Sequence, residues 1–565
     1  MTLAEFNPGG LLVAGGLLLP LLRGKFRALF LLLLPVAGLV HLSVLVPGMH
    51  GVVDFLDYEL VTLRVDRWSM VFGWVFMIAA LVSAIYALHL RAPLQLSAGM
   101  TYAGSAIGAV FAGDLMTLFV FWELTAITSV LLVWAGRGAK AYQAGMRYLI
   151  VQIASGTLLF FGAAILFTST GSLEFGAIGL NSAGGWLIFI AFGIKAAFPL
   201  LHAWLPDAYP EASEVGTVFL SAFTTKLAVY ALARGFAGTD LLIPIGAAMV
   251  VFPIFFALIE NDLRRVLAYS LNNQLGFMVM GIGIGTEMSL NGAAAHAFTH
   301  VLYKSLLFMS MGAVLYRTGT AKASELGGLW RSMPLTTAFC LVGVASIAGM
   351  PFFSGFVSKS MIVSAAAQGG YLFAWAALMF AAACMFLPDI KIPYFAFFGR
   401  DSGKKCQEAP INMLVAMAIA AAFCIAIGLM PGRLYALLPY HVAYAPYSVS
   451  HVLAQLQLLL FAGLAFALLV RWRVLPLAEP GINLDVDWLW RGLGASVVKT
   501  VARVFEIGGY CLGALLSFKL SLFSGMVERH RLPDGFLSRS WPTGSMSLWV
   551  MLMLVAYLVL YYLGG

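Results

Sequence analysis

Gly193–Pro206 reads Gly-Ile-Lys-Ala-Ala-Phe-Pro-Leu-Leu-His-Ala-Trp-Leu-Pro, and the rest of the chain can be interpreted outward from it. The stretch begins like an apolar helix that crosses a membrane, yet it holds Lys195 and, four residues later, Pro199. A lysine at membrane depth costs roughly 2.5–3.5 kcal/mol on insertion scales. A proline removes a backbone donor, which a membrane tolerates only where other groups satisfy the freed backbone. A charge beside a helix break therefore predicts a functional site inside the membrane.

The composition is that of a helical membrane protein. Of the 565 residues, 61% are hydrophobic and 10% are charged, whereas soluble domains carry about 25% charged residues. The apolar runs are long and continuous, which argues against a transmembrane β-barrel. The net charge of +8 is assigned to cytoplasmic loops and not to nucleic-acid binding. The apolar N-terminus has no cationic segment before it, so it is interpreted as a retained helix.

No cofactor and no metal are predicted. The five cysteines stand singly, without the spacing of a metal site, and no glycine-rich phosphate loop follows a strand. Nucleotide, flavin and haem binding are therefore not expected. The chain is expected to have no catalytic chemistry of its own, although it would fit a subunit of an ion-translocating oxidoreductase.

About sixteen apolar runs are long enough to cross a bilayer, for which about 20 residues are needed. They predict an all-α polytopic fold of about 14–16 transmembrane helices. The runs fall at residues 9–22, 27–47, 68–90, 93–112, 114–135, 145–169, 185–204, 215–236, 240–260, 266–285, 289–316, 335–366, 370–392, 411–430, 451–472 and 545–563.

Basic residues follow mainly the odd-numbered runs and so predict the orientation. By the positive-inside rule these loops face the cytoplasm of a bacterial inner membrane, and both termini face outward. Loop 48–67, on the predicted outer side, is rich in acids instead. The basic residues are Arg23, Lys25, Arg27, Arg91, Arg137, Lys140, Arg147, Arg264, Arg265, Arg317, Lys322, Arg331, Lys391, Arg400, Lys404, Lys405, Arg471 and Arg473.

A second broken segment lies at Ala345–Lys359, five runs after the first. It combines two glycines with Pro351 and ends on Lys359. Paired interrupted helices at matching positions are typical of inverted repeats with ion or substrate sites near the midplane. The odd offset of five runs would give the two repeats opposite topology.

Residues 486–530 depart from this pattern, because charged residues punctuate an otherwise apolar helix between Asp487 and Gly535. Such a segment favours an amphipathic helix on the membrane surface or on a neighbouring protein, followed by a terminal transmembrane helix. One more imperfect span is the alternative.

Three charged residues, Glu123, Lys195 and Lys226, each lie inside a different apolar run. Glu123 has Trp and Phe on its N-terminal side, and Lys195 is its candidate partner. Pairing would favour the charged form of both groups, whereas an unpaired buried carboxylate would hold its proton. Lys226 lies about 16 Å from either end of its run, which is far for a lysine to reach an interface. A desolvated lysine can load and release a proton.

His296, His300 and Lys304 recur every four residues and form one stripe along a helix. The stripe suits a proton path, with sites about 6 Å apart that water can bridge. Metal binding by two histidines is the rival interpretation, but no acid or cysteine nearby completes a site. Lys359 extends the path, and His202 and Asp207 are accessory candidates. For Asp114 and Asp262, at run ends, helix capping is at least as good an explanation.

The chain resembles the antiporter-like membrane subunits shared by respiratory complex I, Mrp-type Na+/H+ antiporters and membrane-bound hydrogenases. In the Mrp antiporters the D subunit is of this kind. The resemblance covers about residues 100–400. It rests on five stretches, Phe121–Glu123, Lys195 with Leu201–Ala208, Asp262–Ser270, His300–Phe308 and Gly355–Lys359.

This resemblance implies a core of fourteen helices with two inverted five-helix repeats, each containing a broken helix. It also implies that Glu123 pairs with Lys195, that Lys226 and Lys359 continue the path, and that the stripe from His296 to Lys304 connects the halves. Two segments depart from the family pattern, Glu211–Gly216 after the Trp-Leu-Pro motif and Leu271–Gly276.

The expected function is proton translocation, or Na+/H+ antiport, within a multisubunit membrane complex. A redox-driven arm of an NADH-quinone oxidoreductase or hydrogenase is one alternative; a stand-alone solute transporter and a non-conducting scaffold are others. The expected divisions are N-terminal helices at 1–92, a first repeat at 93–237, a second at 238–392, C-terminal core helices at 393–485, and the amphipathic and terminal helices at 486–565.

Overall fold

The computed structural model describes residues 6–55, 58–472, 478–481, 483–486, 488, 492, 494–531 and 543–563. The chain divides into two compact units, Met1–Asn483 and Leu484–Gly565, which we describe separately.

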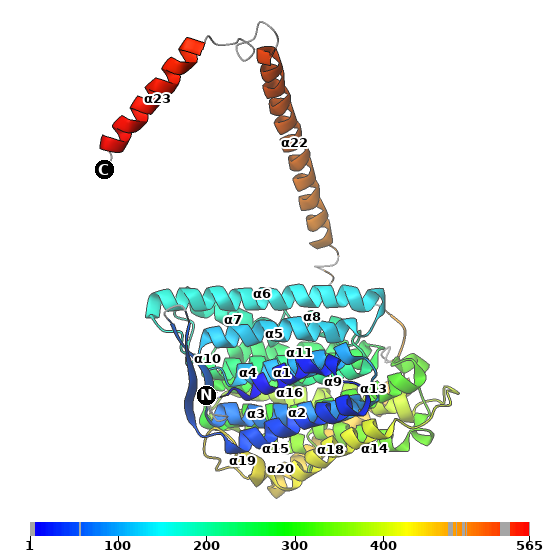
Figure 1. The fold of residues 1–565 in the computed structure, drawn as a ribbon. Coiled ribbons are helices and arrows are strands. Elements are labelled where there is room, and N and C mark those ends of the chain that lie inside the picture. Colours follow the sequence, from blue (N-terminus) through cyan, green and yellow to red (C-terminus); the bar gives the residue numbers. More distant parts are fainter. Residues whose placement is uncertain are drawn as a thin grey trace. The chain divides into compact units, whose positions relative to one another are not determined.

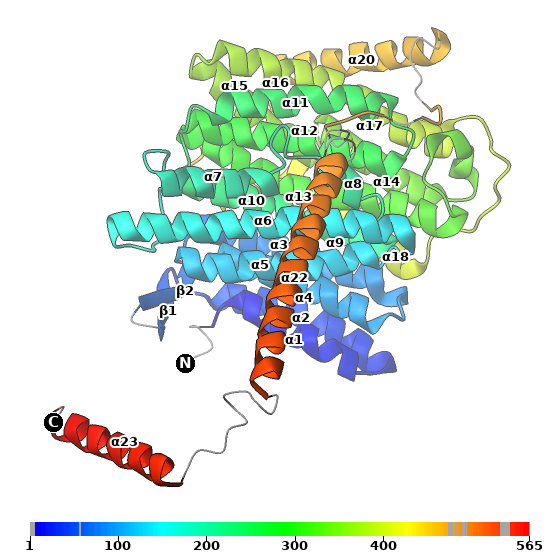
Figure 2. The ribbon, with the colours of Figure 1, turned by 90° about the horizontal axis from the view of Figure 1, so that it is seen from above.

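The first unit is a bundle of helices that lie side by side (Figures 1 and 2). Its central helix, α13, is buried along nearly its whole length, whereas α20 lies at one edge of the bundle in Figure 2 and α1 and α2 at the other. The helices are α1 (Pro8–Leu18), α2 (Gly24–Val44), α3 (Arg67–Tyr86), α4 (Pro93–Val110), α5 (Leu115–Trp134), α6 (Gly138–Thr170), α7 (Ala183–Lys195), α8 (Trp204–Ala208), α9 (Glu214–Ala222), α10 (Thr224–Gly235), α11 (Leu242–Ile259), α12 (Leu263–Ile284), α13 (Glu287–Thr318), α14 (Pro334–Ala348), α15 (Ser354–Gln368), α16 (Leu372–Cys384), α17 (Phe386–Pro393), α18 (Ile411–Leu429), α19 (Pro431–Tyr435) and α20 (Val449–Trp472).

Eleven helical segments of the described residues are long and apolar enough to cross a membrane. Each of the sixteen runs predicted from the sequence contains a helix, so the helical membrane fold is confirmed. Five of the runs fall outside the eleven, namely the short helices α1, α7 and α14 and the more polar helices α4 and α12. Two of the short helices, α7 and α14, end at breaks in the chain.

Two corners of the bundle are built in the same way. Asp114 caps α5 by accepting from Thr117 N at 2.7 Å, and Asp262 caps α12 by accepting from Arg264 N at 2.8 Å. Each aspartate also forms an isolated β-bridge to the loop after the next helix, at Glu174 and Lys322 respectively. Capping side chains satisfy amides that a helix start leaves free. Both corners precede a long helix and then a broken one.

A β-hairpin, β1 (Gly48–Phe55) and β2 (Tyr58–Val65), corrects the expectation of a purely helical fold. The strands are antiparallel, with Gly48 opposite Val65. Leu63 and Val65 alternate with polar positions and are buried, as the two-residue period of a strand requires. The hairpin joins the bundle where Arg64 N donates to the carbonyl of Phe111 at 2.7 Å.

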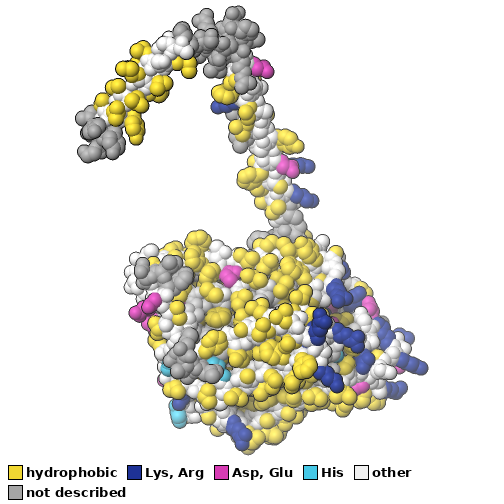
Figure 3. Space-filling view, viewed as in Figure 1, with side chains coloured by type: hydrophobic (Ala, Val, Ile, Leu, Met, Phe, Trp, Pro, Cys, Tyr) yellow, Lys and Arg dark blue, Asp and Glu magenta, His cyan; other side chains and the backbone are white. Residues whose placement is uncertain are grey.

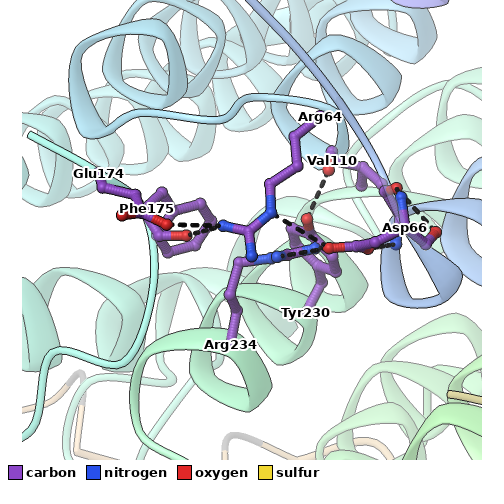
Figure 4. Close-up of polar contacts among 8 residues, drawn as sticks. Arg64, Asp66, Val110, Glu174, Phe175, Tyr230 and Arg234 are labelled. Carbon is purple, nitrogen blue, oxygen red and sulfur yellow. Dashed lines mark hydrogen bonds and ion pairs between the residues drawn. The ribbon is translucent and has the colours of Figure 1, made fainter. Parts of the chain in front are cut away.

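A cluster of charges fastens this hairpin to the end of α10 (Figure 4). Arg234 donates to both carboxylate oxygens of Asp66 at 2.8 and 2.9 Å, and Arg64 contacts the same carboxylate at 3.2 Å. Arg64 also reaches the Glu174 carboxylate at 3.7 Å. Burial alone would raise the pKa of Asp66, but its hydrogen bonds to Arg234 and the nearby positive charge hold that pKa below its usual range.

Lysine and arginine side chains gather at the end of the first unit opposite the hairpin (Figure 3). This is the charge asymmetry on which the predicted orientation rests. The orientation of the termini stays a prediction.

The second unit contains α22 (Ala495–Arg531) and α23 (Thr543–Leu563). The predicted amphipathic segment 486–530 is thus helical from Ala495, and the last predicted span corresponds to α23. Arg473, Asp487 and residues 532–542, which enter the sequence-based predictions, lie outside the described residues.

Candidate ion pathway

The first break separates α7, which ends at Lys195, from α8, which begins at Trp204. Pro199 lies between them, where the sequence predicts a break. Ala197 (φ 59°) and Leu200 (φ 70°) adopt left-handed backbone, which residues other than glycine seldom do. The chain therefore turns sharply beside the buried lysine.

The backbone that the break frees is satisfied locally. The Gly193 carbonyl accepts from Phe198 N at 3.0 Å, and the Ile194 carbonyl accepts from the Trp204 indole at 2.9 Å. Such partners are required because lipid offers no hydrogen bonds to an open helix end. The Trp-Leu-Pro motif of the sequence thus supplies a donor to its own broken helix.

Lys195 is fully buried and is held by α5. Its ammonium donates to the carbonyl of Trp122 at 2.7 Å and to the hydroxyl of Thr125 at 2.6 Å, and it lies 4.2 Å from the centre of the Trp122 ring. Thr125 donates its own hydrogen bond to the same carbonyl at 2.6 Å. The predicted partner, Glu123, is the next residue along α5, yet Lys195 donates to neutral oxygens and not to its carboxylate.

Glu123 points elsewhere, against α6. It is only half buried, and its carboxylate occupies the space that a side chain at Gly156 would need, since a Cβ there would overlap Oε1. The structure therefore brings Glu123 and Lys195 onto neighbouring elements without joining them in an ion pair.

Lys226 lies just after a second irregularity, between α9 and α10 at Phe223. The side chain is fully buried, and its ammonium donates back across the irregularity to the Ser221 carbonyl at 2.6 Å. Lys226, like Lys195, is thus bound by a neutral oxygen.

The three residues of the stripe, His296, His300 and Lys304, are fully buried on α13, where their four-residue spacing puts them along one face. His296 contacts the Ser358 hydroxyl at 3.0 Å through Nδ1 and the Gln274 amide oxygen at 3.2 Å through Nε2. The ring of His300 lies 6.1 Å from that of His296, and among the described residues neither of its ring nitrogens has a hydrogen-bond partner. In proteins, buried polar atoms without a protein partner are commonly satisfied by ordered water.

The third member of the stripe reaches an acid that the sequence-based prediction omits. Lys304 donates to the Ser270 hydroxyl at 2.8 Å, and Ser270 donates to the Asp389 carboxylate at 2.8 Å. Asp389 lies in α17, near the end of a predicted run, where a charge is easily taken for a loop residue.

The second break separates α14 from α15 at residues 349–353, as predicted around Pro351. Gly349 (φ 72°) and Phe352 (φ 73°) carry the left-handed backbone here. Lys359 donates to the Ile347 carbonyl of the broken helix at 2.5 Å and stands over the Phe277 ring at 5.1 Å.

Two basic residues expected in cytoplasmic loops are buried instead. Lys391 donates to the carbonyls of Leu258 at 2.7 Å and Glu260 at 2.5 Å, and so caps the C-terminus of α11. Arg264 donates to the carbonyl of Pro210 at 2.7 Å, next to the departure at Glu211–Gly216. Arg264 follows one run and Lys391 lies at the end of another, but both side chains fold back onto the free carbonyls of another segment.

The accessory candidates lie beside the first break. His202 is buried, with its ring 4.4 Å from that of Phe252. Asp207 accepts two hydrogen bonds from Arg147 of α6, at 2.7 and 2.9 Å. Asp207 therefore ties the broken helix to α6.

Residues 112–385 match a protein family described as NADH:quinone oxidoreductase/Mrp antiporter, transmembrane. The D subunit of the Na+/H+ antiporter of Alkalihalophilus pseudofirmus is 27% identical over 72% of this chain and 92% of its own length. A probable A/B subunit of the K+/H+ antiporter of Rhizobium meliloti is 29% identical over 66% of this chain, which spans only 40% of that relative. Hydrogenase-4 component B of Escherichia coli is 27% identical over 69% of this chain and 65% of its own length.

Solved structures share the fold. A chain of the Mrp complex of Dietzia sp. superposes with a TM-score of 0.69 at 22% identity, over 77% of this chain and 96% of its own. A chain of an archaeal membrane-bound sulfane sulfur reductase superposes with a TM-score of 0.71 at 21% identity, over 98% of this chain and 99% of its own. Residues 112–385 therefore belong to the family of NADH:quinone oxidoreductase and Mrp antiporter membrane subunits.

Proposed function

We propose that this chain translocates protons within a multisubunit membrane complex, either in exchange for Na+ or driven by a reaction in a partner subunit. One observation carries the proposal: fully or almost fully buried titratable groups lie at both helix breaks and on the helices between them in the chain. These groups are Lys195, Lys226, His296, His300, Lys304 and Lys359, and Glu123 is half buried.

The way three of the lysines are held supports this use. Lys195, Lys226 and Lys359 each donate to a backbone carbonyl. A neutral amine can keep such a bond, whereas an ion pair is lost when either partner changes its charge. Binding to neutral oxygens therefore lets a lysine gain or lose a proton without dismantling its site.

Two cavities supply access in this proposal. One of about 750 Å³ opens at the basic end of the first unit and is lined by Glu211, Glu214, Asp262 and Arg264. Another of about 250 Å³ borders Lys359 between α15, α16 and α20, beside His451. Protons would enter from the cytoplasmic side through the first and reach the opposite side from the second.

The two matching corners and the two broken helices support inverted repeats at 93–237 and 238–392. In that arrangement Asp114 corresponds to Asp262, and the break after Lys195 corresponds to the break before Lys359. Inverted repeats place ion sites at their interface near the midplane, and α13 would lie at that interface because it packs against α9 and α10 as well as α12 and α15.

Partners follow from the relatives, which are named as antiporter subunits and as a hydrogenase component. A redox-driven complex is a second candidate, favoured by the fold shared along nearly the whole chain with a chain of a sulfane sulfur reductase, a respiratory complex. In either assembly the residues of this chain would do the same work. The surface position of the segment 486–530 and the outward termini belong to the same proposal.

The test is proton movement by the whole complex, purified in mild detergent and reconstituted in vesicles with a pH-sensitive dye inside. The partners that co-purify identify the complex and its driving reaction. Lys226→Met should lower the initial rate of proton movement about tenfold or more, because it removes a proton carrier. The control is Lys140→Met, which removes an exposed lysine and should leave the rate unchanged. A normal rate in an assembled Lys226→Met complex would overturn the proposal.

A further inference from the structure

Asp389 is a buried carboxylate that neither the family resemblance nor the predicted pathway uses. Its side chain is 1% exposed, and it accepts a hydrogen bond from Ser270 at 2.8 Å. Ser270 in turn accepts one from Lys304 at 2.8 Å, and both of these side chains are fully buried. Removing a carboxylate from water costs several kcal/mol, so its place beside the stripe needs an explanation.

The three groups come from three helices, and the middle one bridges the others. Asp389 lies on α17, Ser270 on α12 and Lys304 on α13, and α12 packs against both of its neighbours. A hydroxyl can donate one hydrogen bond while it accepts another. Ser270 does both here, so the contacts run in one direction, from the ammonium through the hydroxyl to the carboxylate.

The local backbone holds Asp389 in place. A helical irregularity at Met385 separates α16 from α17, and one π-helical turn, Tyr394–Phe398, follows α17. Between them Lys391 anchors α17 to the C-terminal carbonyls of α11. Short π-helical turns are frequent at functional sites, and this one begins five residues after Asp389.

Asp389 also occupies a position like that of Lys226. Lys226 lies three residues after the irregularity at Phe223, and Asp389 lies four residues after the one at Met385. If α16–α17 is the counterpart of α9–α10 in the second repeat, each half places one titratable side chain just beyond an interrupted helix.

We propose that Asp389 is a proton-carrying residue, linked to Lys304 by the hydroxyl of Ser270, so that Lys304, Ser270 and Asp389 form a proton relay. This inference rests on the proposed proton translocation. In the step, Lys304 Nζ gives one proton to Ser270 Oγ while Ser270 Oγ gives its own proton to Asp389 Oδ1. The products are a neutral amine, an intact hydroxyl and a neutral carboxylic acid, so no proton is gained or lost. Reversal of the step returns the charged pair.

The experiment uses the reconstituted whole complex and compares Asp389→Asn, Ser270→Ala and Ser270→Thr. Asp389→Asn removes the carboxylate that accepts the proton, because an amide cannot take one up, and should lower the initial rate of proton movement about tenfold or more. Ser270→Ala should lower it strongly as well, whereas Ser270→Thr keeps the hydroxyl and should retain most of the rate. The matched control is Ser310→Ala, a buried serine of α13 that donates to the Leu306 carbonyl at 2.9 Å.

A purely structural role for Asp389, as compensation for the charge of Lys304, is separated by Ser270→Ala, which leaves both charges in place and removes only the hydroxyl between them. Charge compensation predicts that the Ser270→Ala complex keeps both its thermal stability and its rate of proton movement. The relay predicts that proton movement is lost in Ser270→Ala and retained in Ser270→Thr. Normal transport in an assembled Ser270→Ala complex would therefore overturn the relay.

The relay and the proposed function fail in different ways. If Lys226→Met abolishes transport but Asp389→Asn and Ser270→Ala complexes assemble and transport normally, only the relay is wrong. If Lys226→Met transports normally too, the proposed function is wrong and the relay falls with it.

Discussion

Arg234 at the hairpin end and Lys195 at the first break are both buried cations, but they are held in opposite ways. Arg234 meets two carboxylate oxygens of Asp66 at 2.8 and 2.9 Å. Lys195 meets one carbonyl and one hydroxyl, at 2.7 and 2.6 Å. A paired charge is fixed because losing either partner leaves the other unpaired. A cation bound by neutral oxygens can change its protonation state, so the first arrangement suits structure and the second suits proton transfer.

The largest effect is expected from Lys195→Met. Methionine fills a similar volume without the ammonium, and Thr125 still donates to the Trp122 carbonyl, so no buried donor is left unpaired. Proton movement by the assembled complex should fall about tenfold or more, while its thermal midpoint stays the same or rises. Vesicle assays measure the transport rate, and thermal unfolding of the same preparation measures the stability. A variant that is unstable yet transports protons would show that Lys195, like Arg234, has a structural role.

Asp66→Asn should do the reverse. The change leaves the buried Arg234 without its carboxylate and should cost about 2–3 kcal/mol of stability. Proton movement per assembled complex should change by less than about twofold, since the cluster lies outside the proposed path. The thermal midpoint and the transport rate measure the two effects. The double variant Asp66→Asn/Arg234→Met should recover part of the lost stability. If it does not, Asp66 stabilises the protein through something other than its pair with Arg234.

The same pair predicts a dependence of stability on pH. Because the pKa of Asp66 in the folded protein lies below its usual value of about 3.9, the pair stabilises the fold fully above that value. The contribution is lost as pH falls through the folded pKa. Thermal midpoints of wild type and Asp66→Asn should therefore differ near neutral pH and converge in acid. A gap between them that stays constant down to about pH 3 would contradict this assignment.

The helical fold could be predicted from the sequence because the bilayer sets the length and hydropathy of every span. The breaks could be predicted as well, since Pro199 and Pro351 interrupt apolar runs. The hairpin could not be distinguished from an acid-rich loop, although Leu63 and Val65 alternate with polar residues as in a strand. Length and composition indicate spans more strongly than they indicate a short strand pair.

The site was predictable as a set of buried charges but not as a set of contacts. The sequence offers Lys195 as a candidate partner of Glu123, yet the rotation of α5 decides that the lysine meets a carbonyl of this helix while the carboxylate faces α6. Asp389 and Lys391 are close to the end of a run, and only the packing of α17 against α11 and α12 shows that both are buried. Contacts of this kind depend on helix rotation, which hydropathy does not specify.

The smallest effect is expected from Gly156→Ala, which tests whether the position of Glu123 matters. An added Cβ would overlap the Glu123 carboxylate oxygen, but that oxygen ends a flexible side chain that can move aside. Stability should therefore change by less than about 1 kcal/mol, whereas proton movement should fall about two- to fivefold as the carboxylate shifts away from its present site. The control is Gly138→Ala at the start of α6, where nothing lies within 4 Å of an added Cβ, although its φ of 87° adds backbone strain. Normal transport with an altered Glu123 position, seen in a structure of the variant, would exclude Glu123 from the path. It would then be a half-buried acid that, unlike Asp66, is neither structural nor part of proton transfer.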